Sequence, residues 1–162
     1  MTKAQKPTPR ISKTIAVKFK DEMQVSPALR GYFGYCLFKA GARLRLLMDE
    51  AMASHKMQCH HFGILRVLTI NEVISQIKLG DELGIDKASM VKLIDHLEKN
   101  KYVIRQTDKQ DRRVKNVQLT EKGIKALAFC DSIKSRIEAD FFKNVTSSEQ
   151  AILKKLIPQL LP

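Results

Sequence analysis

The chain has few of the features that secreted or membrane-spanning proteins need. Its 162 residues include three cysteines, with no CxxC pair, and no tryptophan. An odd number of widely spaced cysteines does not form a disulfide scaffold, so we expect reduced thiols and a cytoplasmic location. No apolar stretch is long enough to span a bilayer, and the basic N-terminus lacks the apolar run of a signal peptide.

Arrangements that carry catalysis are also missing. We find no Gly-rich phosphate loop, no pair of carboxylates at useful spacing and no Ser/His/Asp arrangement. His55, Cys59, His60 and His61 are close in sequence, but they include no carboxylate and no Cys pair. Polar residues are also expected at a junction between helices. We therefore expect no enzyme activity, no cofactor and no metal site.

Acidic residues are few relative to basic ones. The chain has 29 Lys and Arg against 17 Asp and Glu, a formal charge of +12. Residues 1–30 hold seven basic and two acidic residues, and residues 86–122 hold ten and six. Such an excess indicates a polyanionic partner, and nucleic acid is the commonest one. Hydrophobic residues make up 44% of the chain, which is enough for a packed core.

Two helices separated by a glycine turn are predicted in the middle of the chain. Ser75 is a good cap for a short helix at Gln76–Leu83, and Gly84 can take the left-handed conformation that ends it. Asp86 then caps a second helix, whose first turn is Lys87, Ala88 and Ser89. This spacing is typical of a helix-turn-helix.

The second helix has an apolar and a polar side. The apolar side has Met90, Leu93, Ile94 and Leu97. The other side carries Ala88, Ser89, Lys92, Asp95, His96 and Lys99. Most such faces are only solvated, but this one follows a helix-turn-helix spacing and precedes a hairpin. Lys92 and His96 are four residues apart, so both can point into a major groove at once.

A charged hairpin follows the second helix. Tyr102–Ile104 and Val114–Leu119 have the composition of short strands, and a charged loop joins them. Arg112 and Arg113 at its tip can enter a narrow minor groove, where the negative potential is strongest. Asp111 would repel phosphate, so we expect it to orient an arginine through a salt bridge.

The flanking segments predict an arm and a helical dimerisation region. The basic segment Met1–Gln24 is either a flexible tail or an arm that touches DNA, and its part Ile11–Phe19 could instead lie against a partner subunit. A long helix is expected from Ser26-Pro27 to about Ala53, and another at Cys59–Ile70. A helix from Thr120 to about Lys143 and a final one after Thr146 carry long apolar stripes.

The apolar stripes of the last two helices exceed what a small winged domain needs. The first contains Ile124, Leu127, Cys130, Ile133, Ile137 and Phe141, and the second contains Ile152, Leu153, Leu156, Ile157 and Leu160. The surplus predicts a homodimer with interleaved terminal helices. We thus expect a mainly α (α+β) protein with a basic arm at 1–24, dimerisation helices at 25–58 and 124–162, and a winged helix-turn-helix at 59–123.

The wing carries the most specific family signal. In the MarR (multiple antibiotic resistance regulator) family of bacterial transcription factors, Asp-Arg-Arg is followed by a strand and Leu-Thr-x-x-Gly. The stretch Asp111–Gly123 resembles this pattern throughout, and Leu97–Val103 resembles the family's Leu-Glu-x-x-Gly-Leu-Val. Lys101 replaces the usual glycine, so we expect Asn100 to take the left-handed conformation. The resemblance covers roughly Arg30 to the C-terminus.

The resemblance implies a homodimer that binds a pseudo-palindromic operator in double-stranded DNA, usually as a repressor released by a small ligand. The DNA-binding residues are then Ser75, Lys87, Ala88, Ser89, Lys92, His96, Lys109, Arg112, Arg113 and Lys115. By the same resemblance, Arg113 is the arginine expected in the minor groove. The family's ligand pocket would be lined by Tyr32, Tyr35, His60, His61 and Arg66.

Three other functions are compatible with the same sequence. An architectural or partner-binding winged protein would hold DNA mainly through its phosphates. A thiol-based regulator would use Cys36, which lies about two residues from the place of the reactive thiol in the peroxide-sensing branch of the family; a buried structural thiol is the simpler interpretation. The third is a winged domain that binds RNA.

Overall fold

The computed structural model describes residues 25–71, 73–108 and 110–161. The predicted arm at 1–24, including Ile11–Phe19, and the predicted DNA contact Lys109 lie outside the described residues. The chain divides into two compact units, Met1–Leu46 and Leu47–Pro162. The predicted winged domain and the last two helices fall within the second unit.

The described part of the first unit contains a short 3-10 helix and most of a long α-helix. The 3-10 helix, η1, covers Pro27–Leu29, and the α-helix, α2, covers Phe33–Met52 and so runs on into the second unit. A helix does start at Ser26-Pro27, with Ser26 as its N-cap residue and Pro27 in its first turn, but it is the short η1. The predicted long helix begins only at Phe33. Gly31 and Gly34 flank the true start, and each glycine lowers helix propensity by about 1 kcal/mol relative to alanine.

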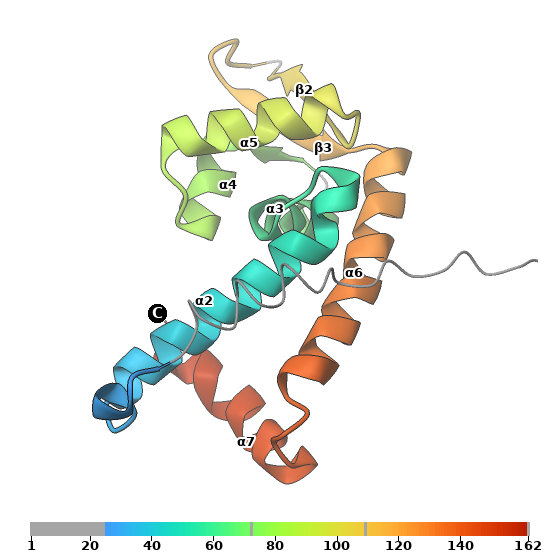
Figure 1. Cartoon of the computed structure of the whole chain (residues 1–162). Coiled ribbons are helices and arrows are strands. Elements are labelled where there is room, and N and C mark those ends of the chain that lie inside the picture. The colour runs from blue at the N-terminus through green and yellow to red at the C-terminus, as the bar shows by residue number, and fades with distance from the viewer. Residues whose placement is uncertain (1–24, 72, 109, 162) are drawn as a thin grey trace, which may run out of the picture. The chain divides into compact units, whose positions relative to one another are not determined.

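The second unit contains a helix-turn-helix, a hairpin and two further helices (Figure 1). After α2 the elements are η2 (Ala53–His55), α3 (Cys59–Ile70), β1 (Ile74–Ser75), α4 (Gln76–Leu83), α5 (Lys87–Lys99), β2 (Val103–Thr107), β3 (Lys115–Leu119), α6 (Glu121–Phe141), α7 (Ser147–Leu156) and η3 (Ile157–Leu160). The predicted winged helix-turn-helix is confirmed, and α3 and α4 have the predicted bounds. None of the described helices is long and apolar enough to cross a membrane.

The sheet has three antiparallel strands in the order β1-β3-β2. The hairpin was predicted, although β2 extends further towards the tip, to Thr107. The two-residue β1 was not predicted, because it exists only through its pairing with Val117 and Asn116 of β3. A buried core joins the helices to the sheet through Ile64, Leu65, Leu79, Met90, Ile94, Leu97, Val103, Val117 and Cys130.

The turn between α5 and β2 has its left-handed residue at Lys101 (φ 61°), whereas Asn100 has φ −86°. The expectation for Asn100 was therefore wrong. The turn is held from the start of α6: the Thr120 hydroxyl donates to the carbonyl of Lys101 at 2.7 Å, and the Lys122 ammonium donates to the carbonyl of Asn100 at 2.8 Å. These contacts offset the cost of about 1–2 kcal/mol that a side chain normally incurs in this conformation.

The last two helices bury their apolar residues to different extents. In α6, Leu127, Cys130, Ile133 and Ile137 are buried as predicted, but Ile124 is 57% exposed. The Thr146 hydroxyl and the Glu149 carboxylate form a capping box at the start of α7, as its sequence predicts. No residue of α7 is buried within the chain, so its apolar stripe lacks a core to cover it.

Gly123 makes the junction between α6 and the α5–β2 turn possible. A Cβ atom at this position would lie 2.0 Å from the carbonyl oxygen of Tyr102, a distance that no packed structure tolerates. We predict that Gly123→Ala lowers the free energy of unfolding by about 3 kcal/mol, measured by urea denaturation. Gly63→Ala is the matched control, because a Cβ at this position would meet Leu83 at an ordinary 3.7 Å. The free energy of unfolding of this variant should be unchanged or slightly higher.

Candidate nucleic-acid interface

The first turn of α5 is exposed and its cap is complete. The Asp86 carboxylate accepts the backbone N–H of Ser89 at 2.9 Å, and hydrogen bonds from the Ser89 side chain and backbone lower the pKa of Asp86. Four predicted contact residues follow on the solvent side, namely Lys87, Ala88, Ser89 and Lys92. The capped N-terminus adds partial positive charge to the two lysines, so this turn favours an anion.

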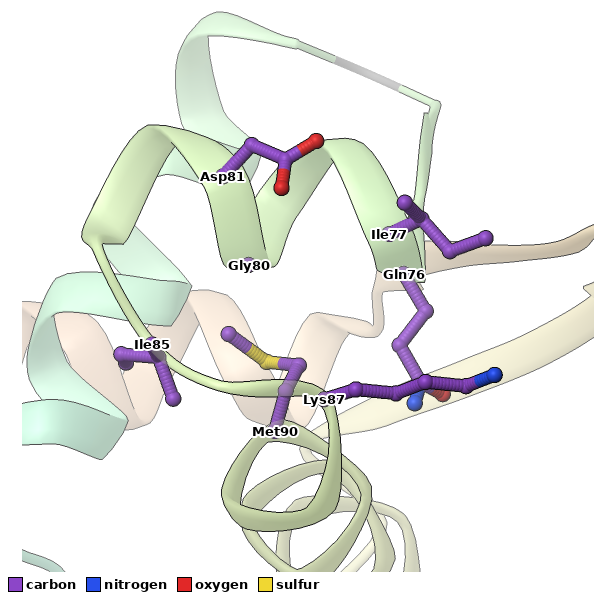
Figure 2. Close-up of a pocket in the computed structure, with 7 residues that line it drawn as sticks. All are labelled: Gln76, Ile77, Gly80, Asp81, Ile85, Lys87 and Met90. Atoms are coloured by element: carbon purple, nitrogen blue, oxygen red, sulfur yellow. The ribbon is translucent and has the colours of Figure 1, made fainter.

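A small pocket lies in the seam between α4 and α5 (Figure 2). A Cβ on Gly80 would lie 3.0 Å from the carbonyl oxygen of Ile85, so the small residue lets the chain approach α4. Met90 fills the seam from below, while Gln76 and Lys87 extend along its mouth. The remaining cavity is only about 140 Å³. Ser75 caps α4 by accepting the N–H of Lys78 at 3.2 Å. The seam therefore leaves only a small space between the two helices.

His96 lies half-buried against the start of α3. Its ring stacks on that of His61, with centroids 4.5 Å apart and planes at 17°. Its Nε2 lies 2.5 Å from the carbonyl oxygen of Lys56, so this nitrogen carries a proton that the carbonyl accepts. Lys92 is exposed and has no such partner contact among those the structure describes. The predicted base contact of His96 thus requires the ring to leave the stack.

The hairpin tip is shaped by carboxylates that accept backbone N–H groups. Asp108 accepts those of Gln110 and Asp111, at 2.8 and 3.1 Å, and the amide of Asn116 at 2.9 Å. The two backbone N–H groups, followed by Asn116, lower the pKa of Asp108. The tip therefore keeps its shape without burying apolar groups.

Arg112 and Arg113 are exposed in the turn of this tip. Asp111 accepts the backbone N–H of Arg113 at 2.9 Å. The ion pairs of the described residues include none from Asp111 to either arginine, so the predicted salt bridge was wrong. Both guanidinium groups are free to reach phosphate or a groove. Lys115 is exposed and donates to the Thr107 hydroxyl at 2.8 Å across the hairpin.

Three of the five predicted ligand residues lie in the second unit and face different neighbours. Arg66 forms an ion pair with Asp131 and lies over the ring of Phe62. His60 and His61 line two open cavities, of about 390 and 560 Å³, that share Lys92 and Leu93 of α5. Tyr32 and Tyr35 belong to the first unit. The ligand site stays a prediction, with His61 its most enclosed member.

The thiols and histidines show no converging cluster. The Cys36 thiol lies 3.4 Å from the carbonyl of Arg30 and is half-buried. His55 stacks on Phe129, with centroids 3.6 Å apart. Within residues 25–71, 73–108 and 110–161, no three His, Cys, Asp or Glu side chains come together as a metal site would require.

Two features of the interface were not anticipated from the sequence. One is the His61–His96 stack, which joins two residues 35 positions apart in the sequence and has no local signal. The other is Arg105, whose side chain contacts both helices of the helix-turn-helix. The sequence did contain a signal for these contacts of Arg105. It is an arginine in the strand directly after a helix that carries the acidic residues Asp95 and Glu98.

Comparisons with known proteins agree with this geometry. The MarR family model matches residues 60–115. A mutant MarR from E. coli complexed with operator DNA has a TM-score of 0.72 and 21% identity, covering 85% of this chain and 100% of that one. A probable transcriptional regulator from Pseudomonas aeruginosa has a TM-score of 0.73 and 22% identity, and the match covers 82% of this chain and 99% of that one. The regulator PcaV from Streptomyces coelicolor, in complex with its natural ligand, has a TM-score of 0.70 and 18% identity. That match covers 85% of this chain and 96% of that one. At these identities the solved structures establish the fold.

His61 should make stability depend on pH. Its Nδ1 accepts the N–H of Gln58 at 3.0 Å, and burial, then His96 and His60, lowers its pKa from 6.5 to about 4. Between these values the unfolded chain binds a proton that the folded chain does not. The free energy of unfolding should therefore fall as the pH drops from about 6.5 to about 4, by at most about 1.4 kcal/mol per unit.

Urea denaturation between pH 4.5 and 7.5 measures this slope. His61→Asn keeps an acceptor for the N–H of Gln58 but cannot titrate, so the slope should decrease. His55→Asn, at an exposed position, is the control and should keep it. An equal slope in the His61→Asn variant and the original protein would assign the pH dependence to other groups.

Proposed function

We propose that this chain, whose residues 60–115 match the MarR family model on a winged helix-turn-helix fold, is a transcriptional regulator that binds duplex DNA sequence-specifically and represses transcription. The observation that carries this proposal is the exposed, capped start of α5, beside a hairpin whose tip presents Arg112 and Arg113. A helix of this kind fits a major groove, and arginines fit the adjacent minor groove.

The proposed roles follow from exposure. Ala88, Ser89 and Lys92 would face base edges, because they share the solvent side of α5. Ser75, Lys87 and Lys115 would contact phosphates. Arg113 would enter the minor groove, and Arg112 would contact a phosphate. The E. coli relative of this fold, solved with operator DNA, supports the assignment by analogy.

A homodimer is part of the proposal. Ile152, Leu156 and Leu160 are 55, 48 and 64% exposed, although they form the apolar stripe of α7 and η3. A second copy of the chain would cover this stripe. Two-fold symmetry would then present two α5 helices to a pseudo-palindromic operator.

We also propose that a small molecule controls DNA binding. The cavity of about 560 Å³ is lined by His61 of α3 and by Lys92 and His96 of α5. An occupant would compete with DNA for Lys92 and would alter the packing of His96. The structure of PcaV with its natural ligand shows that one protein of this fold is ligand-bound, which supports the proposal.

A phosphate-dominated mode of binding is the second candidate, because the chain has a charge of +12. Such a protein would hold all duplexes with similar affinity and with a steep dependence on salt. The two candidates differ in whether a side chain of α5 reads a base.

Two steps separate the two candidates. The preferred duplex is first selected from a random library, and the affinity of the Lys92→Ala variant for it is then measured. If Lys92 reads a base, the variant should lose about 1–3 kcal/mol on the selected duplex and should tolerate more bases at one position, as measured by titration at fixed salt. Lys99→Ala, at the exposed far end of the same face, is the charge-matched control. An equal loss for selected and scrambled duplexes would favour the phosphate-dominated candidate.

Leu156→Glu tests the dimer. The side chain is exposed within one chain, so the change should leave the fold intact, but a carboxylate without a partner would be buried at the interface. Light scattering at micromolar concentration should show a dimer for the original protein and a monomer for Leu156→Glu. Gln159→Glu adds the same charge nearby and should remain dimeric. A monomeric original protein would contradict the interleaved-helix proposal.

A further inference from the structure

Arg105 of β2 contacts several groups of the winged domain at once. Its backbone N–H donates to one carboxylate oxygen of Glu98 at 3.0 Å, and its Nη1 donates to the other at 2.8 Å. Nη1 also lies 2.6 Å from the Asp95 carboxylate. The side chain is only 20% exposed, so it is fixed in place rather than free on the surface.

The same side chain reaches two further groups. Its Nη2 donates to the carbonyl oxygen of Val91 at 3.3 Å, and its Nε donates to the side-chain oxygen of Gln76 at 3.2 Å. Val91, Asp95 and Glu98 lie at successive turns of one side of α5, and Gln76 is the first residue of α4. One guanidinium therefore joins both helices of the helix-turn-helix to the strand that leads into the wing.

The ion pairs of Arg105 also change the charge that α5 presents to solvent. Asp95 is 57% exposed on α5, the helix proposed to enter the major groove. An unpaired carboxylate there would repel the phosphates on either side of the groove. Arg105 compensates this charge from the side of the sheet, so the polar face of α5 stays compatible with DNA.

The hairpin transmits the position of Arg105 to the wing tip. Arg105 is paired with Val117 of β3, and the ladder continues through Gln106–Asn116 and Thr107–Lys115 to the tip. The rigid ladder thus ties Arg112 and Arg113 to the same anchor that holds α5. The offset between α5 and the wing then depends on this side chain together with the α5–β2 turn.

We propose that Arg105 is a positioning residue that sets the relative placement of α5 and the wing, and so contributes to sequence selection without touching DNA. This inference rests on the proposed function. An arginine with a purely structural role would affect stability alone. A positioning arginine also affects the ratio of affinities for selected and scrambled duplexes. The reason is that α5 and the wing must both fit the same operator to read it.

The test compares this ratio in the original protein and in Arg105→Met, which keeps the aliphatic stem. The ratio should fall by about tenfold, the size of coupling found between members of one hydrogen-bonded network. Leu127→Ala is the control for lost stability: it opens a cavity in the core at α6 and leaves every contact of Arg105 in place, so its ratio should be unchanged.

Glu98→Gln is the second variant, for use if Arg105→Met does not fold. It keeps an acceptor for the N–H of Arg105 and removes the ion pair, and its ratio should fall in the same direction. A ratio within about twofold of the original in a folded variant would overturn the inference and make Arg105 a structural residue. If the original protein selects no duplex at all, the proposed function itself fails, and the inference fails with it.

Discussion

The close approach of α6 to the carbonyl group of Tyr102 is the constraint on which the winged domain depends. Gly123 leaves room for this carbonyl, whose oxygen accepts the N–H of Thr120 at 3.1 Å. The Thr120 hydroxyl in turn accepts the N–H of Gly123 and donates to Lys101. One contact therefore closes the α5–β2 turn and starts α6. Because α5 and β2 diverge at this turn, it determines where α5 ends and the hairpin begins.

Charge separates two functions along α5. Its N-terminal half is capped by Asp86 and exposes lysines, whereas its C-terminal half carries Asp95 and Glu98, which Arg105 compensates. The dipole of a helix favours anions at its N-terminus and cations near its C-terminus. The position of Arg105 near the C-terminal end of α5 agrees with that field, as would the phosphate contacts proposed at its N-terminal end. His96 adds a third tie, to the chain between α2 and α3. The exposed turn can thus meet a ligand while the rest of the helix stays anchored.

Local signals predicted the elements well, and tertiary contacts account for the errors. Ser75 and Asp86 cap their helices as predicted, Thr120 lies at the predicted start of α6, and Gly84 is left-handed at φ 62°. These features depend on neighbours within a few residues. The left-handed Lys101 and the short β1 depend on partners far along the chain, in α6 and β3. For the candidate site, exposure of Lys92 and of the wing arginines followed from pattern. The stack of His96 on His61 and the contacts of Arg105 required knowledge of which faces meet.

In the proposed homodimer, the uncovered stripe of α7 would link this local anatomy to recognition over a longer operator. A single winged domain reads few base pairs, and each mismatch costs about 1–3 kcal/mol. Joining two domains makes the second contact intramolecular, so that modest half-site energies combine without any new base contact. This gain requires that each half hold its helix and wing rigidly, since a loose half would lose the benefit of a fixed separation. The anchors around Tyr102 and Arg105 supply that rigidity within the half, and the apolar residues of α7, none of them buried in the chain, are available to fix the separation between halves.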